Sequence, residues 1–163
     1  MANKKKLSWK AGQSAAQNAT EVLPALAVAF FAQGKALTPH APPEALRSFR
    51  LQAKRLRDTL ELFRPCYTPR LERLLTVLRE IQQILGELND LRTTRKLLAD
   101  RGFDKSDPSV LDSLAARMAD KPGLFFTLWQ KTFAREHEER RWVNYLAGGT
   151  FRPRKPGHKP GGT

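Results

Sequence analysis

The sequence is poor in residues that build covalent or metal-bound frameworks. Its 163 residues include a single cysteine, Cys66, which excludes an intrachain disulfide and a thiolate metal site and fits a reducing cytoplasm. The three histidines lie far apart, at His40, His137 and His158. The Glu-x-x-His pairs of a di-metal carboxylate bundle are missing. We therefore expect neither a metal nor another cofactor.

Long apolar runs, strand patterns and phosphate-cradling loops are also missing. The apolar run from Val22 to Ala32 is much shorter than the ~20 residues that cross a membrane, so it predicts a core helix. A polar stretch separates it from the basic start, which argues against a signal peptide. No Gly-rich loop precedes a Lys-Ser or Lys-Thr pair, which disfavours nucleotide hydrolysis of the P-loop type. We expect a cytoplasmic protein that is not a P-loop enzyme.

Positive charge is abundant and concentrated at the two ends. The chain has 29 Lys and Arg against 16 Asp and Glu, a net charge of +13. Four lysines in residues 1–10 and four Lys or Arg in residues 148–163 account for eight of the 29, and neither end has an acid. The middle keeps 21 basic and 16 acidic residues, a net charge of +5. The total charge favours a polyanionic partner. Any anion-binding site in the middle must arise from how its charged residues are arranged, because the excess of basic residues there is small.

Apolar residues recur every three or four positions, which is the period of amphipathic helices. We predict helices over residues 12–33, 44–64, 69–100, 106–120 and 124–147, with Thr68 as a cap, Gly34 as a stop and Lys121-Pro122-Gly123 as a break. Gly86 inside the third helix suggests a close helix crossing. The expected fold is an all-α bundle of about four to five antiparallel helices over residues 11–147. A basic segment, 1–10, precedes it, and a disordered basic Gly/Pro-rich tail, 148–163, follows it.

A cationic stripe on the second predicted helix is the main functional signal. Arg47, Arg50, Lys54 and Arg57 are three, four and three residues apart and share one helix face. Like charges at this spacing repel, so an anionic ligand that neutralises them explains the stripe better than a solvated face does. Arginine offers a planar fork for phosphate oxygens, and the stripe is roughly 15 Å long. Aromatic residues do not interleave with it, which favours a phosphate chain over single-stranded nucleic acid.

Two sequence motifs then resemble the CHAD family, the conserved histidine α-helical domains. The first is Arg-x3-Lys-Arg-Leu-Arg from Arg50 to Arg57, followed by Leu-Glu-Leu-Phe; the second is Leu-Gly-x-Leu-Asn-Asp from Leu85 to Asp90. The resemblance spans about residues 44 to 100. It implies an all-helical, non-enzymatic protein that binds inorganic polyphosphate and lies on polyphosphate granules.

The resemblance also assigns residues. It matches Arg50, Lys54, Arg55 and Arg57 to the basic positions of the first motif, and Asn89 and Asp90 to the polar positions of the second. Glu87, Asn89 and Asp90 form a polar cluster that we interpret as an anchor for the arginines of the preceding helix, with catalytic carboxylates as the alternative. Arg47 stands where the family has its namesake histidine, so a pH-tuned role of that position is in doubt. Family members usually contain two bundles, which suggests a homodimer here.

The sequence therefore predicts a non-enzymatic polyphosphate-binding bundle with no membrane association. The expected contacts are Arg47, Arg50, Lys54, Arg55 and Arg57, aided by Arg92, Arg95, Lys131 and Arg135 from facing helices, with Asn89 and Asp90 as a structural polar anchor. One alternative is a nucleic-acid-binding protein whose basic ends do most of the work. Another is a phosphohydrolase or a regulatory partner of a polyphosphate-metabolising enzyme.

Overall fold

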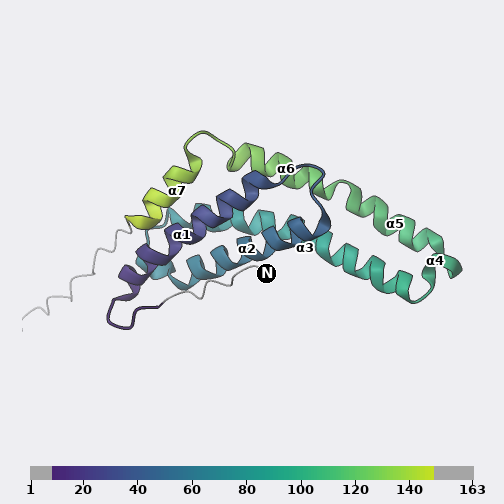
Figure 1. The fold of residues 1–163 in the computed structure, drawn as a ribbon, viewed down its shortest axis with the longest axis horizontal. Helices are drawn as coiled ribbons and strands as arrows, with labels where there is room; N and C mark the ends of the chain where they lie inside the picture. The colour runs from purple at the N-terminus through teal and green to yellow at the C-terminus, as the bar shows by residue number, and fades with distance from the viewer. Residues whose placement is uncertain (1–8, 149–163) are drawn as a thin grey trace, which may run out of the picture.

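A computed structural model describes residues 9–148 of the chain, and these form helices with no strand among them (Figure 1). In order, the elements are α1 (Ala15–Ala36), α2 (Pro43–Leu62), the 3-10 turn η1 (Arg64–Cys66), α3 (Leu71–Asp100), α4 (Phe103–Ser106), α5 (Pro108–Ala119), α6 (Lys121–Thr132) and α7 (Glu138–Ala147). The all-α expectation is confirmed. The expected basic segment and tail fall largely outside the described residues. None of the described helices has the length and apolarity needed to cross a membrane.

An aromatic cluster fills the centre of the body formed by α1, α2, α3, α6 and α7. Phe30 of α1 lies at its middle, with its ring centroid 5.2 Å from that of Phe49 on α2 and 5.6 Å from that of Trp129 on α6. Trp142 brings α7 into the same cluster at 6.3 Å from Phe30. Offset and edge-on ring pairs of this kind add stability beyond their buried area. The cluster fixes how α2 is oriented, because Phe49 must face inward.

The start of α1 is held by a complete capping box. The Ser14 hydroxyl accepts from the backbone N–H of Gln17 at 3.2 Å, and the Gln17 side chain accepts from the Ser14 backbone at 2.9 Å. Asn18 is buried, and its amide group bonds the backbone of Lys10 in both directions. The chain from residue 10 onward therefore belongs to the folded body.

The close helix crossing is at Gly34, and the prediction of one at Gly86 is wrong. A Cβ atom on Gly34 would lie 2.0 Å from Cη2 of Trp129, whereas one on Gly86 would meet nothing within 4 Å. Gly34 therefore lets the indole of α6 lie flat against the backbone of α1. It also does not stop the helix, since α1 continues to Ala36.

The third helix begins without the predicted cap. The side chain of Thr68 bonds the hydroxyl of Tyr145 on α7 at 3.1 Å instead of capping α3, whose N-cap residue is Arg70. The side chain that the local sequence predicts as a helix cap thus makes a tertiary contact with a distant helix instead.

The C-terminal third differs most from the prediction. Lys121-Pro122-Gly123 is the first turn of α6 rather than a break, because proline is well suited to the first turn of a helix. The predicted helix over 124–147 is interrupted between Thr132 and Glu138, where His137 has a positive φ of 63°. This corner lets both Phe133 and Trp142 reach the aromatic cluster, with ring centroids 5.5 Å apart.

The second half of α3 extends beyond the body together with α4 and α5 (Figure 1). Within the described residues, α3 buries seven side chains up to Leu88 and none after it. The body therefore ends near Leu88, and the functional residues of α3 lie at this boundary.

Candidate functional site

The cationic stripe of α2 lies on the side of that helix that faces α3. At one end of the stripe, Arg57 donates a hydrogen bond to the side-chain oxygen of Gln82 on α3. At the other end, Arg47 shares a hollow with Asn89 and Arg92 of α3. Arg50 lies between these ends at helical spacing, whereas Lys54 lies at the outer edge of the stripe, where it lines a hollow on the outer surface of α2. We call the strip between the two helices the α2–α3 groove.

The hollow beside Arg47 is the most cationic part of this groove. It has a volume of about 240 Å³, and its lining combines the first two turns of α2 with one stretch of α3: Pro43, Glu44, Leu46, Arg47, Leu85, Leu88, Asn89, Arg92, Thr93 and Lys96. Three of these residues are cationic and one, Glu44, is acidic. Partial burial lowers the pKa of Arg92, and the nearby carboxylate of Glu44 acts in the opposite direction. An arginine in such a setting stays charged. Lys96 is paired with Asp100 at 2.7 Å, so Arg47 and Arg92, which have no ion pair within the described residues, supply the uncompensated positive charge of the hollow.

Three cations of the stripe have no ion pair within the described residues: Arg47, Arg50 and Lys54. Their charge is available to an anion from solution. Uncompensated positive charge thus extends along about 10 Å of α2, at 1.5 Å per residue, from Arg47 in the groove to Lys54 at its outer edge.

Arg57 differs, because its charge is already compensated. Its guanidinium lies 2.7 Å from Asp58 and 3.8 Å from Glu61, and its side chain is only 26% exposed. With the bond to Gln82, it connects α2 to α3. The structure therefore places Arg57 in the framework of the groove, whereas the sequence grouped it with the ligand contacts.

Arg55 lies on a different face of α2. It lines a hollow together with Leu51, Asp58 and Leu62, on the outer surface of the helix. The sequence motif contains both Arg55 and Arg57, but a helix turns by about 100° per residue, so these two residues, two positions apart, point to nearly opposite sides and cannot share one narrow groove.

The polar cluster of α3 is divided between two sides of that helix. Asn89 lines the hollow beside Arg47, whereas Asp90 and Glu87 line another hollow facing α5 and α6. Glu87 is ion-paired with Lys121 of α6, which lowers the pKa of the carboxyl group. The groove residue of α3 that bonds an arginine of α2 is Gln82. Asn89 is thus placed to contact a ligand, and Asp90 is not in the groove.

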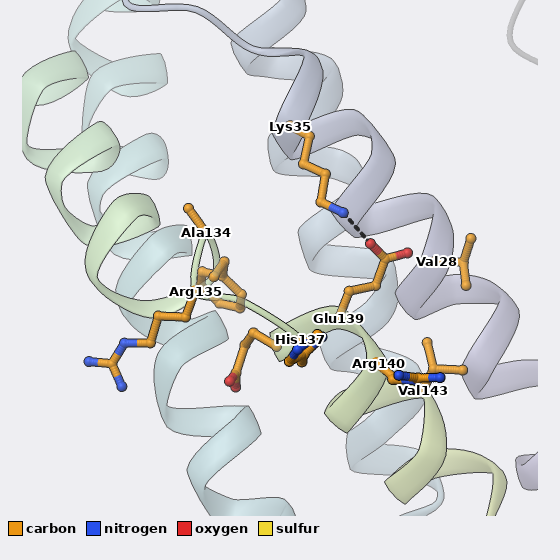
Figure 2. A pocket seen from close by; sticks show the side chains of 10 residues that line it. Val28, Lys35, Ala134, Arg135, His137, Glu139, Arg140 and Val143 are labelled. Carbon is orange, nitrogen blue, oxygen red and sulfur yellow. Dashed lines mark hydrogen bonds and ion pairs between the residues drawn. The ribbon is translucent and has the colours of Figure 1, made fainter.

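Of the residues predicted from facing helices, only Arg92 lines the hollow. Arg95 is exposed on α3, and Lys131 is exposed in the last turn of α6. Arg135 lies in the corner between α6 and α7, in a hollow of about 380 Å³ where Lys35 and Glu139 form an ion pair (Figure 2). That hollow is bordered by α1 and α7, so the structure does not bring Arg135 into the groove.

Lys96 is a groove residue that the sequence reasoning missed. It follows Arg92 by four positions, so the two lie one turn apart on the same side of α3. That spacing is the sequence pattern from which Lys96 could have been predicted as a neighbour of Arg92. Among residues 9–148, no group of three or more His, Cys, Asp or Glu side chains is placed to hold a metal ion.

These observations define a class of protein: an all-helical domain with a cationic groove between two adjacent helices. Comparison with known families matches residues 2–99 to the CHAD domain, which is more than half of the chain. The chain belongs to the CHAD domain family. The match includes α1, α2 and nearly all of α3, and therefore both sides of the groove. No curated protein and no solved structure matched the chain.

Proposed function

We propose that this protein binds inorganic polyphosphate in the α2–α3 groove, as a non-enzymatic binding protein. The observation that carries the proposal is the hollow in which Arg47 of α2 faces Arg92 and Lys96 of α3. Membership of the CHAD domain family, which is known for polyphosphate binding, supports the same ligand. A linear chain of phosphates has regularly spaced negative charge, and a straight row of cations complements it.

Binding would be driven by electrostatics. Arg47, Arg50 and Lys54 would each neutralise charge on the phosphate chain and release counterions from it, so affinity should fall steeply as salt rises. Arginine would hold phosphate oxygens in a fork, and the amide N–H of Asn89 would donate a neutral hydrogen bond nearby. Glu44 opposes binding, because its carboxylate faces the same hollow. We further propose that this binding recruits the protein to polyphosphate granules in the cytoplasm.

The test is a competition titration at near-physiological salt. Long-chain polyphosphate competes with duplex DNA and with RNA, at equal phosphate concentration, for the full-length protein and for a variant lacking residues 1–8 and 149–163. The truncation stops at residue 8 because Lys10 bonds Asn18 in the body. We expect polyphosphate to win against both nucleic acids and to keep its advantage after truncation. If truncation abolishes binding, the groove is not the site.

A second candidate function is nucleic-acid binding through the basic ends. The observation that favours it is the eight Lys and Arg without a single acid in residues 1–10 and 148–163. Electrostatic binding by such segments needs no defined groove. Equal competition by DNA, RNA and polyphosphate, lost on truncation, would support this function instead.

A regulatory or hydrolytic role in polyphosphate metabolism is distinguished by a different measurement. Polyphosphate is incubated with the protein and a divalent cation, and released phosphate is measured. We expect no release above the rate without protein. Release that depends on the protein would overturn the non-enzymatic proposal while leaving the binding site in place.

A further inference from the structure

The outer face of α2 has two unusually exposed leucines. Leu51 is 52% exposed and Leu62 is 69% exposed, although most large apolar side chains of the described residues are covered. Both line a shallow hollow of about 400 Å³, which also includes Arg55 and Asp58, with Lys54 and Thr59 on its sides. The main contacts of α2 are with α1, α3 and η1, so none of the other described helices packs extensively on this outer face.

The order of these four residues is self-complementary. Along α2 they read Leu51, Arg55, Asp58 and Leu62, separated by four, three and four positions. Reversing the direction of the helix gives the same spacing, with apolar residues still at the ends and the two charges exchanged. A helix face with this order matches a second copy of itself in the antiparallel orientation. In a two-fold interface each contact occurs twice.

We propose that this outer face of α2 is a homodimer interface, in which α2 of a second copy packs antiparallel across a two-fold axis. Leu51 of each copy lies opposite Leu62 of the other. Arg55 of each copy lies opposite Asp58 of the other, and Lys54 lies opposite Thr59, so no like charges face each other. Apolar contacts at the ends and opposite charges at the centre favour the antiparallel register over the parallel one.

Arg55 and Asp58 have partners within the chain, and the proposal allows for them. Oδ1 of Asp58 accepts from Arg57 at 2.7 Å and 3.2 Å, so the second carboxylate oxygen can still accept a hydrogen bond. A guanidinium has five N–H donors, so an existing contact of Arg55 does not prevent another. A single helix pair gives an interface at the small end of specific interfaces, below about 1,200 Å² in total. We therefore expect a reversible dimer whose population depends on protein concentration.

The two-fold axis has a consequence for the α2–α3 groove. The axis is perpendicular to the plane of the two antiparallel helices, so features on one side of α2 stay on that same side in the second copy. Both cationic stripes would then lie on one surface of the dimer. One long polyphosphate could engage both grooves, which raises its apparent affinity without any new contact. This consequence rests on the proposed function, whereas the dimer itself does not.

The interface is tested by sedimentation equilibrium of the full-length protein across a range of concentrations without ligand. We expect a reversible monomer–dimer equilibrium. Leu62→Ser should raise the dimer dissociation constant by about tenfold or more, because two leucine contacts are lost per dimer. Leu97→Ser is the matched control, since Leu97 on α3 is 50% exposed and lies outside this face. A strict monomer at high concentration, or an equal effect of both substitutions, would overturn the proposal.

A charge exchange tests the antiparallel register. Arg55→Glu and Asp58→Arg each place like charges opposite one another twice, so each alone should weaken the dimer by more than about tenfold. Together, R55E and D58R restore opposite charges with their positions exchanged, and the dimer should recover. Failure of the double variant to dimerise, while its helix content is unchanged by circular dichroism, would refute this register.

The effect of polyphosphate is then measured separately. Long chains should lower the dimer dissociation constant, because a ligand that binds both grooves stabilises the dimer by mass action. If the dimer forms without ligand and long polyphosphate binds but leaves the equilibrium unchanged, the shared-surface consequence is wrong. If polyphosphate does not bind at all, the proposed function fails and the dimer stands.

Discussion

Replacing Arg47, Arg50 and Lys54 together with glutamine should make polyphosphate binding much less sensitive to salt. These three side chains have no ion pair within residues 9–148, so each can neutralise a phosphate of the ligand at no cost to an internal contact. Arg57 is left in place because its guanidinium is paired with Asp58. The substitutions keep helix-forming side chains of similar length, so α2 should stay folded.

The size of the effect follows from counterion release. For a flexible single-stranded polyanion, each neutralised phosphate contributes about 0.7 to the slope of log affinity against log salt. Three lost contacts should therefore reduce the slope by about 2. Between 50 and 200 mM salt, the wild-type affinity should fall about 20-fold more than that of the triple variant.

The assay is fluorescence anisotropy with end-labelled polyphosphate at four or more salt concentrations. The control variant replaces Arg101, Lys105 and Arg117 with glutamine, which removes the same charge from exposed positions outside the groove. An unchanged slope in the groove variant would refute the reasoning. So would an equal change in the control, because it would show that net charge matters and the groove does not.

A change of opposite sign tests the same site. Glu44 is the acidic side chain that lines the hollow beside Arg47. Replacing it with glutamine removes a repulsive charge, so polyphosphate should bind more tightly at every salt concentration. Weaker binding by Glu44→Gln would contradict a site in this hollow.

Three further predictions concern the framework that positions the groove. Gly34→Ala should lower the free energy of unfolding by about 1–3 kcal/mol in urea, because its Cβ would overlap the ring of Trp129, which is only 3% exposed. Gly86→Ala should instead raise it by up to about 1 kcal/mol, because a Cβ there meets nothing and alanine favours the helix; a loss of stability at both positions would contradict the assigned crossing. Tyr67→Phe should cost about 1 kcal/mol, since the Tyr67 hydroxyl donates to the carbonyl of Leu146 at 2.8 Å. Burial raises the pKa of the Tyr67 hydroxyl, so the folding stability that its neutral form contributes is fully present below about pH 10 and is lost as the pH rises further. Thermal melts from pH 8 to 11 should therefore show a smaller alkaline loss of stability in the variant.

The helices that form the groove could be read from the sequence with good accuracy. The predicted ranges 44–64 and 69–100 agree closely with α2 and α3. Leu46, Phe49, Leu56 and Leu60 are buried along one face of α2, as their spacing indicates. A regular apolar period fixes which face of a helix turns inward, because only one face can be covered by its neighbours.

The C-terminal region could not be read in the same way. Its apolar residues are helically spaced on both sides of the corner, and residues 135–141 between them are charged or histidine, with no Gly or Pro to indicate a break, so the sequence predicts one helix there. The bend arises because Phe133 and Trp142 both pack around Phe30, which a straight helix would not allow. Likewise, Gly34 and Gly86 look alike in sequence, and only the position of Trp129 distinguishes them.

The sequence by itself determined that α2 has a cationic face with no acid between Arg47 and Arg57, because helical spacing is a local property of the chain. Only the tertiary structure decided which of those cations can meet a ligand. Arg57 is compensated by Asp58 and connected to Gln82, and Arg55 points to another face, while Arg47 gains Arg92 and Lys96 as neighbours from α3. Charge on one helix is set by its sequence, but the groove depends on which helix lies beside it, and the burial of the aromatic cluster decides that.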